Sequence, residues 1–121
     1  MRTGNRLATA PRTATVREAL LVMTRAKCGS VCVVGKTGKL AGVFTDGDLR
    51  RFMAKAGDAV LEKPLSKVMT AKPATLRESA LAVEALKIFH TRKIDDLIVI
   101  NAKREPVGLI DSQDLPKLKL A

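Results

Sequence analysis

Residues 42–48, with the sequence GVFTDGD, decide the fold of this chain because a related stretch recurs later. Residues 108–114, GLIDSQD, lie 66 positions further along and share the glycine, the apolar pair and the final aspartate. In both, an apolar run typical of a β-strand leads directly into polar residues that favour a helix start. The same shift of 66 aligns apolar positions over residues 18–49, and it places residues 31–34 (VCVV) on residues 97–100 (LIVI). The chain therefore contains an internal repeat.

A helix is predicted near the beginning of each copy. Thr15 with Glu18, and Thr75 with Glu78, have the spacing of a capping box, so we expect a helix to begin after each threonine. The second pair fits a shift of 60 rather than 66, which predicts six additional residues early in the second helix. Gly29 is expected to end the first helix.

Strands are predicted on both sides of each helix. A short extended segment that contains a proline precedes the helix in both copies, at residues 7–11 and 71–74. After the helix, two apolar runs separated by a polar turn predict a β-hairpin. The predicted turns are residues 35–39 and 101–106.

A final helix is predicted directly after each hairpin, beginning at Asp46 in the first copy and at Ser112 in the second. Each copy is then a strand-helix-strand-strand-helix unit, so the fold class is α/β, of the α+β type. One unit of about 55 residues cannot cover its own sheet well. We therefore expect the two units to pack face to face about a pseudo-twofold axis. The predicted domains are residues 1–62 and 63–121.

The composition narrows the class of protein. No apolar run approaches the roughly 20 residues that span a bilayer, and no signal peptide opens the chain, so we expect a cytoplasmic location and no membrane contact. The formal charge is +10, but only three aromatic residues are present. Base-stacking side chains are thus nearly absent, which argues against nucleic acid. Cys28 and Cys32 are expected in the core, and no metal site is predicted.

The polar residues after the first hairpin are suited to a phosphorylated ligand. Thr45 offers a hydroxyl at a helix start, where free amides and the positive end of the dipole favour a phosphate. Asp48 can accept two hydrogen bonds from a ribose or another vicinal diol. At most one of the two following arginines is expected to face the ligand, and we favour Arg51 over Arg50. The acidic preference of helix starts explains Asp46 better than ligand contact does, and it explains Asp48 about as well.

Two other roles for this stretch are disfavoured. A calcium loop would need a glycine where Arg51 stands and a glutamate where Gly57 stands. A catalytic carboxylate pair lacks a nucleophile, a histidine or a third partner nearby in the sequence. The one histidine, His90, is expected at an exposed helix position. We therefore predict no catalytic residue in this chain.

The second copy is predicted to be the poorer site. Asp111 stands where Thr45 stands in the first copy, and its negative charge would repel a phosphate unless Ser112 takes over the role of the hydroxyl. Asp114 keeps the ability to hold a diol. We therefore expect tighter binding at the first copy.

Both copies of the opening stretch resemble the last strand and helix of cystathionine-β-synthase (CBS) domains. That pattern is a glycine, two apolar residues, threonine or serine, two variable residues and an aspartate or asparagine. Residues 42–48 match it in full, and residues 108–114 match it except at Asp111. The repeat as a whole resembles a tandem CBS pair, or Bateman module. The ligand-binding residues proposed on this basis are Thr45, Asp46, Asp48, Arg51, Ser112 and Asp114.

Four segments carry a narrower resemblance: residues 1–4 (MRTG), 44–51 (FTDGDLRR), 68–70 (VMT), and 80–82 (ALA) together with 84–86 (EAL). They are similar to the C-terminal half of the D-arabinose 5-phosphate isomerase family, which serves synthesis of the lipopolysaccharide sugar Kdo. Members of that family carry an isomerase domain before the CBS pair. The chain is therefore expected to be a fragment of such a protein and no enzyme by itself.

Two functions follow from this resemblance. In the first, the pair is a regulatory module that binds AMP, ATP or a CMP-sugar such as CMP-Kdo and modulates the isomerase domain. In the second, it is an assembly element whose ligand cleft is vestigial. No cofactor is required by either. A homodimer is expected from the habit of the family and from apolar helical faces that one pair leaves uncovered.

Overall fold

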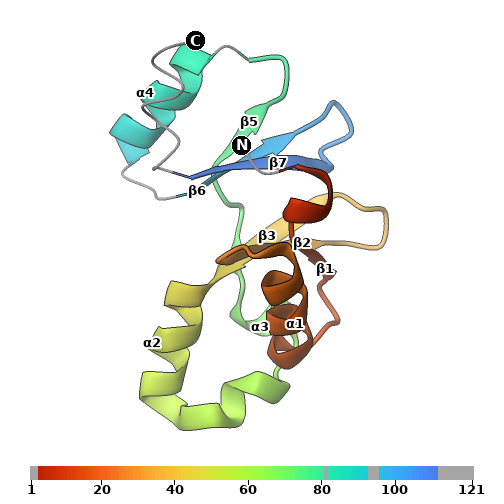
Figure 1. Cartoon of the computed structure of the whole chain (residues 1–121), viewed down its shortest axis with the longest axis vertical. Helices are drawn as coiled ribbons and strands as arrows, with labels where there is room; N and C mark the ends of the chain where they lie inside the picture. Colours follow the sequence, from red (N-terminus) through yellow and green to blue (C-terminus); the bar gives the residue numbers. More distant parts are fainter. Residues whose placement is uncertain (1–2, 81, 93–95, 112–121) are drawn as a thin grey trace.

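The computed structural model describes residues 3–80, 82–92 and 96–111. Two β-sheets lie in the middle of the molecule (Figure 1). The first sheet has the strand order β1-β2-β3-β4, and these strands are Thr9–Pro11, Ser30–Val34, Leu40–Thr45 and Thr70–Ala71. The second sheet has the order β5-β6-β7, and these strands are Thr75–Arg77, Asp96–Ile100 and Pro106–Asp111.

Helices cover the outer sides of the two sheets. In the first repeat, α1 (Val16–Ala26) connects β1 to β2, and α2 (Asp46–Ala56) follows β3, beginning where it was predicted. In the second repeat, α4 (Ala82–Arg92) connects β5 to β6. Figure 1 shows α1 and α2 on one side of the pair of sheets and α4 on the other. The predicted α+β fold of two repeated units is confirmed.

Short helical segments also occur between the main elements. They are η1 (Gly4–Arg6), η2 (Gly57–Glu62) and α3 (Leu65–Val68). The final helix that was predicted to begin at Ser112 lies outside the described residues. The predicted domain boundary between residues 62 and 63 stays a prediction.

Helix α1 begins at the predicted capping box. The Glu18 N–H donates to the Thr15 hydroxyl (3.1 Å), and the Thr15 N–H donates to the Glu18 carboxylate (2.9 Å). The hydrogen bond from the Thr15 backbone lowers the pKa of Glu18 below its ordinary value. The helix ends at Ala26 and is capped by Lys27, which takes the left-handed conformation at φ 52°, so the prediction that Gly29 ends it is wrong. A single non-glycine residue can occupy this conformation at a modest cost.

The second predicted capping box does not form. Thr75 lies in strand β5, and the Glu78 N–H donates to the carbonyl of Ile100 in the neighbouring strand (2.9 Å). The capping pattern is a local signal, whereas Leu76, inside the pattern, is buried in the second core. Pairing with β6 therefore overrides the local preference for a helix start.

Strand pairing also shows that the second copy has no additional residues before its helix. In the first sheet, Thr9 of β1 is opposite Cys32 of β2. In the second sheet, Thr75 of β5 is opposite Ile98 of β6. Both partners are displaced by the same 66 positions, so the repeat continues without a gap upstream of the helices. The predicted shift of 60 is wrong.

The extended segment predicted at residues 71–74 is also corrected, because the first strand of the second repeat lies at Thr75–Arg77. Thr70–Ala71 instead forms β4, which pairs with β3 of the first sheet. This pairing depends on Gly42, since a Cβ atom there would lie 2.6 Å from Sδ of Met69 and 2.7 Å from the carbonyl oxygen of Thr70. Only a glycine lets the β4 backbone approach this closely.

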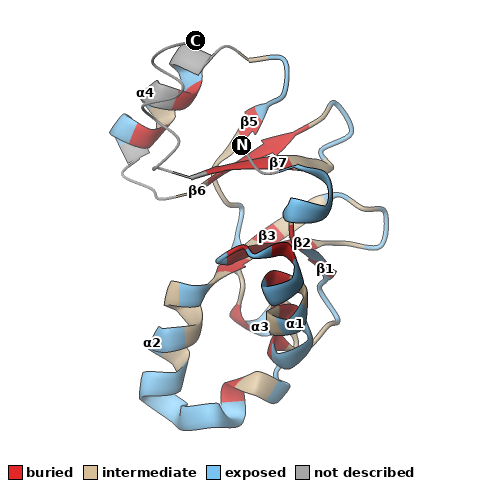
Figure 2. Ribbon diagram, viewed as in Figure 1, coloured by how far each residue is buried: buried red, intermediate tan, exposed pale blue. Residues whose placement is uncertain are grey.

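Both faces of strand β6 are buried, which joins the two repeats. Leu97 and Val99 pack with α4 residues in one hydrophobic cluster, whereas Ile98 and Ile100 belong to the large cluster of the first repeat. Alternate residues of a strand point to opposite faces of its sheet. Figure 2 shows the buried positions concentrated where the sheets meet and where helices cover them. The apolar run at residues 97–100 is thus a strand between two layers.

Several smaller predictions are confirmed. Cys28 and Cys32 are both buried in the core as free thiols, and His90 is exposed on α4. Burial raises the pKa of the Cys32 thiol to about 12, with smaller contributions from Cys28 and Asp96, so this thiol stays protonated and unreactive near neutral pH. Over residues 3–80, 82–92 and 96–111, none of the helices has the length and apolarity needed to cross a bilayer.

Candidate ligand-binding cleft

A cleft of about 450 Å³ lies between the two repeats, beside the N-terminus of α2. We call it the inter-repeat cleft. The first repeat contributes Gly29, residues from the end of β3 and the first turns of α2, and Thr70 of β4 belongs to the same sheet. The second repeat contributes residues of β6 and of the segment before β5. Thr45, Asp46, Asp48 and Arg51, the predicted binding residues of the first copy, all line this one cleft.

Thr45 and Asp48 form two reciprocal hydrogen bonds at the start of α2. The Asp48 N–H donates to the Thr45 hydroxyl (3.1 Å), and the Thr45 N–H donates to Oδ2 of Asp48 (3.0 Å). This is a capping box that sequence reasoning missed, because the pattern is usually sought with a glutamate or glutamine at the third helical position. The two polar groups are therefore fixed in place by the helix start itself.

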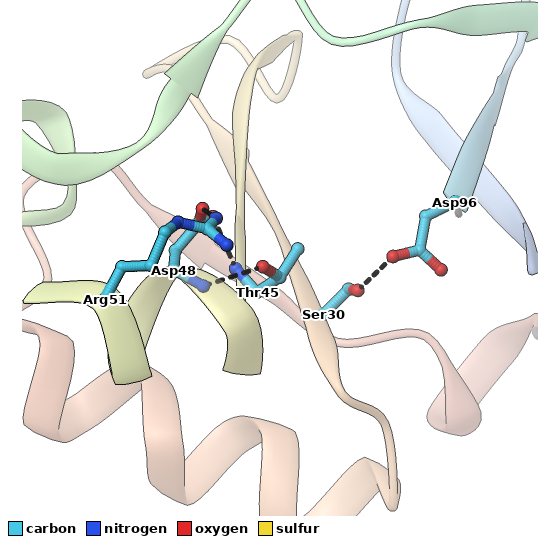
Figure 3. A network of polar contacts seen from close by, with 5 residues as sticks. All are labelled: Ser30, Thr45, Asp48, Arg51 and Asp96. Carbon is cyan, nitrogen blue, oxygen red and sulfur yellow. Dashed lines mark hydrogen bonds and ion pairs between the residues drawn. The ribbon is translucent and has the colours of Figure 1, made fainter. Parts of the chain in front are cut away.

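Arg51 forms an ion pair with Oδ1 of Asp48, one turn back along α2 (Figure 3). The Asp48 carboxylate thus accepts a backbone N–H through one oxygen and a guanidinium through the other. Arg50 lines the cleft as well, whereas only one of the two arginines was expected to do so. Two arginines therefore line the cleft at the N-terminal end of α2.

Asp46 occupies the first position of α2. Its backbone N–H donates to the carbonyl of Gly29 (2.9 Å), which ties the helix start to the beginning of β2. A Cβ atom at Gly29 would lie 3.1 Å from Oδ2 of Asp46. Glycine at this position therefore leaves room for the Asp46 carboxylate at the rim of the cleft.

A contact that sequence reasoning missed links the two repeats at the cleft. The Ser30 hydroxyl donates to Oδ2 of Asp96 (2.9 Å) (Figure 3). Ser30 is 5% exposed, and among the described residues it is the one polar residue that is buried. Asp96 is half-buried and lines the cleft. A buried hydroxyl needs a hydrogen-bond partner, and here the other repeat supplies it.

Ser30 and Asp96 are equivalent positions of the repeat, because they are 66 residues apart and begin β2 and β6. Two equivalent positions can touch only near the axis that relates the copies. Their hydrogen bond therefore lies near the pseudo-twofold axis that relates the two repeats. The repeat alignment paired these two positions, but it gave no sign that they would meet.

Apolar side chains form part of the cleft wall. Val43 of β3 and Ile98 of β6 come from the two facing sheets, and Pro73 and Ala74 come from the segment that connects them. A flat ring system could lie against this apolar surface while polar groups reach α2 on one side and Asp96 on the other. The remaining predicted binding residues, Ser112 and Asp114, lie outside the described residues.

The sequence matches the CBS domain family profile over residues 1–55 and 65–119. Among curated proteins it is 45% identical over 97 residues to the arabinose 5-phosphate isomerase KdsD of Pseudomonas aeruginosa, covering 80% of this chain and 29% of that protein. It is 36% identical over 102 residues to the arabinose 5-phosphate isomerase GutQ of Escherichia coli, covering 84% of this chain and 31% of that protein. The chain thus spans about a third of the length of these relatives.

Solved structures share the fold. A CBS domain protein of Pyrobaculum aerophilum complexed with AMP superposes with a TM-score of 0.82 at 22% identity, covering 100% of this chain and 95% of that one. A CBS-domain-containing protein of Agrobacterium tumefaciens gives 0.79 at 23% identity, covering 93% and 84%. The cytosolic domain of the Mg²⁺ channel MgtE in complex with ATP gives 0.79 at 20% identity, covering 96% and 46%.

Proposed function

This chain belongs to the CBS domain family, and on that basis we propose that it is a regulatory module that binds an adenine nucleotide or a nucleotide-sugar between its two repeats. The observation that carries the proposal is the convergence of Thr45, Asp48 and Arg51 with an apolar wall in the inter-repeat cleft. A phosphate, a ribose and a base each need one of these surfaces. The parts lie within a single hollow of suitable size for a nucleotide.

We expect the phosphate of the ligand to lie at the N-terminus of α2. The positive end of the helix dipole and the two guanidinium groups of Arg50 and Arg51 favour an anion there. The Thr45 hydroxyl already accepts a hydrogen bond from the Asp48 N–H, and its own proton remains available to a phosphate oxygen.

We expect the ribose of the ligand to bind Asp48. In the structure, this carboxylate is paired with Arg51, so a diol must share or replace the guanidinium. The Arg51 side chain is 69% exposed, so its guanidinium can turn toward a phosphate that enters beside it. Exchange of partners therefore lets one ligand engage both residues.

The comparisons support the ligand class and leave its identity open. Structures of the same fold contain AMP and ATP, which favours an adenine nucleotide. A CMP-sugar remains a second candidate, because a feedback ligand from Kdo synthesis would suit a module attached to an arabinose 5-phosphate isomerase. We propose that the module modulates such an isomerase domain, and that this chain alone has no isomerase activity.

A second function is favoured by a specific observation. Leu21 of α1 is 57% exposed and Met53 of α2 is 39% exposed, and both are large apolar side chains on the helices of the first repeat. Covering them in a homodimer would make the pair an assembly element of the isomerase, with or without a ligand.

Isothermal titration calorimetry of the 121-residue chain with AMP, ATP, CMP and CMP-Kdo, combined with thermal unfolding, tests the proposal. Binding of one nucleotide, with a rise in melting temperature that grows with its concentration, is the expected result. Silence across the panel, together with a concentration-dependent dimer in sedimentation, would favour the assembly function. Conversion of arabinose 5-phosphate by the purified chain would contradict its assignment as a non-enzyme.

A further inference from the structure

We propose that Arg51 restricts the inter-repeat cleft to ligands that carry both a phosphate and a vicinal diol. In this structure its guanidinium pairs with Asp48, the carboxylate that is expected to bind the diol. A phosphate draws the guanidinium away and frees the carboxylate, whereas a nucleoside has no group that can do so. This inference rests on the proposed function and adds to it how the site distinguishes nucleotides from nucleosides.

Both oxygens of the Asp48 carboxylate are already hydrogen-bonded. Oδ2 accepts the Thr45 N–H (3.0 Å), and Oδ1 accepts the Arg51 guanidinium. The Asp48 side chain is only 14% exposed. A ribose has to bring its two hydroxyl groups to these same oxygens, because an ionised carboxylate accepts hydrogen bonds and donates none. The Thr45 N–H belongs to the capping box that begins α2, so Arg51 is the partner that has to leave.

The guanidinium also lies beside the place expected for the phosphate. A Cβ atom at Gly47 would lie 3.4 Å from Nη1 of Arg51 and 3.6 Å from Oγ1 of Thr45. Both groups are therefore close to the first turn of α2, and Figure 3 shows the Arg51 side chain reaching back along the helix toward Asp48 and Thr45. A phosphate that binds beside the Thr45 hydroxyl comes within reach of Arg51.

Arg51 is able to exchange one partner for the other. Its side chain is largely exposed, and it makes one hydrogen bond to Asp48, from Nη2 to Oδ1. A guanidinium can donate two parallel hydrogen bonds to a phosphate. The phosphate of a nucleotide is therefore a better partner for Arg51 than the single carboxylate oxygen that it contacts in this structure.

The ion pair lowers the affinity only of ligands that have no phosphate. A ligand that binds one state of an equilibrium loses affinity in proportion to the fraction of molecules in that state. An exposed ion pair favours the paired state by up to about fivefold, so a nucleoside loses up to about this factor. A nucleotide recovers the loss through the bonds between its phosphate and Arg51.

The test is titration of the unmodified chain and of Arg51→Ala with AMP, adenosine and 2′-deoxyadenosine, followed by NMR chemical shifts, which also measure weak binding. Arg51→Ala should lower AMP affinity about tenfold, as for the loss of a charge-assisted hydrogen bond. It should raise adenosine affinity about two- to fivefold, because Asp48 is then free. Since 2′-deoxyadenosine has no vicinal diol, its affinity should not rise. If CMP binds more tightly than AMP, the corresponding cytidine compounds are used.

Lys55→Ala is the matched control for the loss of a positive charge. Lys55 lies one turn beyond Arg51 on α2, is exposed and does not line the cleft. Its removal should leave the affinities for AMP and adenosine close to those of the unmodified chain. The pair of changes expected for Arg51→Ala would, if Lys55→Ala also produced it, overturn the assignment to Arg51. Thermal unfolding verifies that both variants are folded.

The outcomes separate this inference from the proposed function. A rise in adenosine affinity together with a fall in AMP affinity supports both. If AMP binds the unmodified chain, an adenosine affinity that is unchanged or lower in Arg51→Ala overturns the inference and leaves the regulatory function standing. An equal gain for 2′-deoxyadenosine, or a gain for AMP as well, has the same meaning. If neither AMP nor CMP binds the unmodified chain, the proposed function fails and the inference fails with it.

Discussion

The two repeats share one backbone plan but differ in the polar residues where β2 and β6 begin and where β3 and β7 end. The first repeat places hydroxyls at two neighbouring positions, Ser30 at the start of β2 and Thr45 opposite it at the end of β3. The second repeat has aspartates at both equivalent positions, Asp96 and Asp111, which are also opposite each other. The apolar positions match between the two repeats, so both repeats have the same fold. Exchange of hydroxyls for carboxylates changes which ligand group each repeat can meet.

This contrast teaches that the pair is symmetric as a scaffold and asymmetric as a site. In the described part of the cleft, the first repeat contributes Thr45, Asp48 and two arginines, whereas the second repeat contributes Asp96 and apolar side chains. A single ligand can therefore use both repeats at once.

The largest effect on nucleotide affinity is expected from changing Asp48, the carboxylate that we propose binds the diol. Asp48→Asn keeps an oxygen that can cap α2 but loses the charge, so nucleotide affinity should fall about ten- to a hundredfold, or ~1.5–3 kcal/mol. Asp114→Asn, at the equivalent position of the second repeat, should have a smaller effect. Calorimetric titration with AMP compares the two. Loss of binding in Asp114→Asn but not in Asp48→Asn would reverse the ranking of the repeats.

A second prediction concerns β4, the strand that joins the first sheet. Gly42→Ala would bring a methyl group within 2.6 Å of Met69 and 2.7 Å of the Thr70 carbonyl. Overpacking of this kind should lower the free energy of unfolding by about 1–3 kcal/mol. Urea denaturation is the measurement, and Gly35→Ala is the control, because the nearest atom to its added Cβ is 4.0 Å away. Equal stability of the two variants would contradict the close approach of β4.

The two threonines of the predicted capping boxes should behave differently. Thr15→Ala removes the N-cap of α1 and should cost about 1 kcal/mol of stability. Thr75 lies in β5, where a β-branched residue without a hydroxyl is suitable, so Thr75→Val should change stability by less than about 0.5 kcal/mol. Thermal or urea unfolding distinguishes them. A loss in Thr75→Val as large as that in Thr15→Ala would argue that Thr75 caps a helix after all.

The smallest effect is expected in the pH dependence of stability. The pKa of Glu18 is lowered in the folded chain by the Thr15 backbone N–H, so its contribution is present above the ordinary glutamate pKa and is lost as pH falls through the lowered value. Glu18→Gln should therefore make stability less sensitive to pH in the acid range below about 4.5. Glu78→Gln removes a carboxylate outside any capping box and is the control. Identical acid unfolding curves for Glu18→Gln and the unmodified chain would exclude this contribution.

Local sequence patterns predicted the elements whose stabilising contacts are close in the chain. The capping box of α1, both hairpins and the start of α2 at Asp46 depend on residues within a few positions of each other, and all are present. The strand at Thr75–Arg77 was missed because its hydrogen-bond partners lie in β6, more than 20 positions away. A local capping pattern was the stronger signal in the sequence there.

The site was predicted in the same uneven way. Thr45, Asp46, Asp48 and Arg51 follow one another in the chain, and resemblance to CBS domains placed them in a ligand site; they line one cleft in the structure. Ser30 and Asp96 were not predicted, since neither is unusual in its own strand. They become a pair only when the two sheets pack.

The sequence by itself determined the repeat, the order of strands and helices in each copy and the polar residues at the start of α2, because periodicity and local motifs involve residues close together in the chain. The tertiary structure decided which residues of the two repeats face each other. That choice depends on burying both faces of β6 between α4 and the first sheet, which brings together positions 66 residues apart. The hydrogen bond between Ser30 and Asp96 is the product of that packing, and it holds a carboxylate of the second repeat beside the cleft.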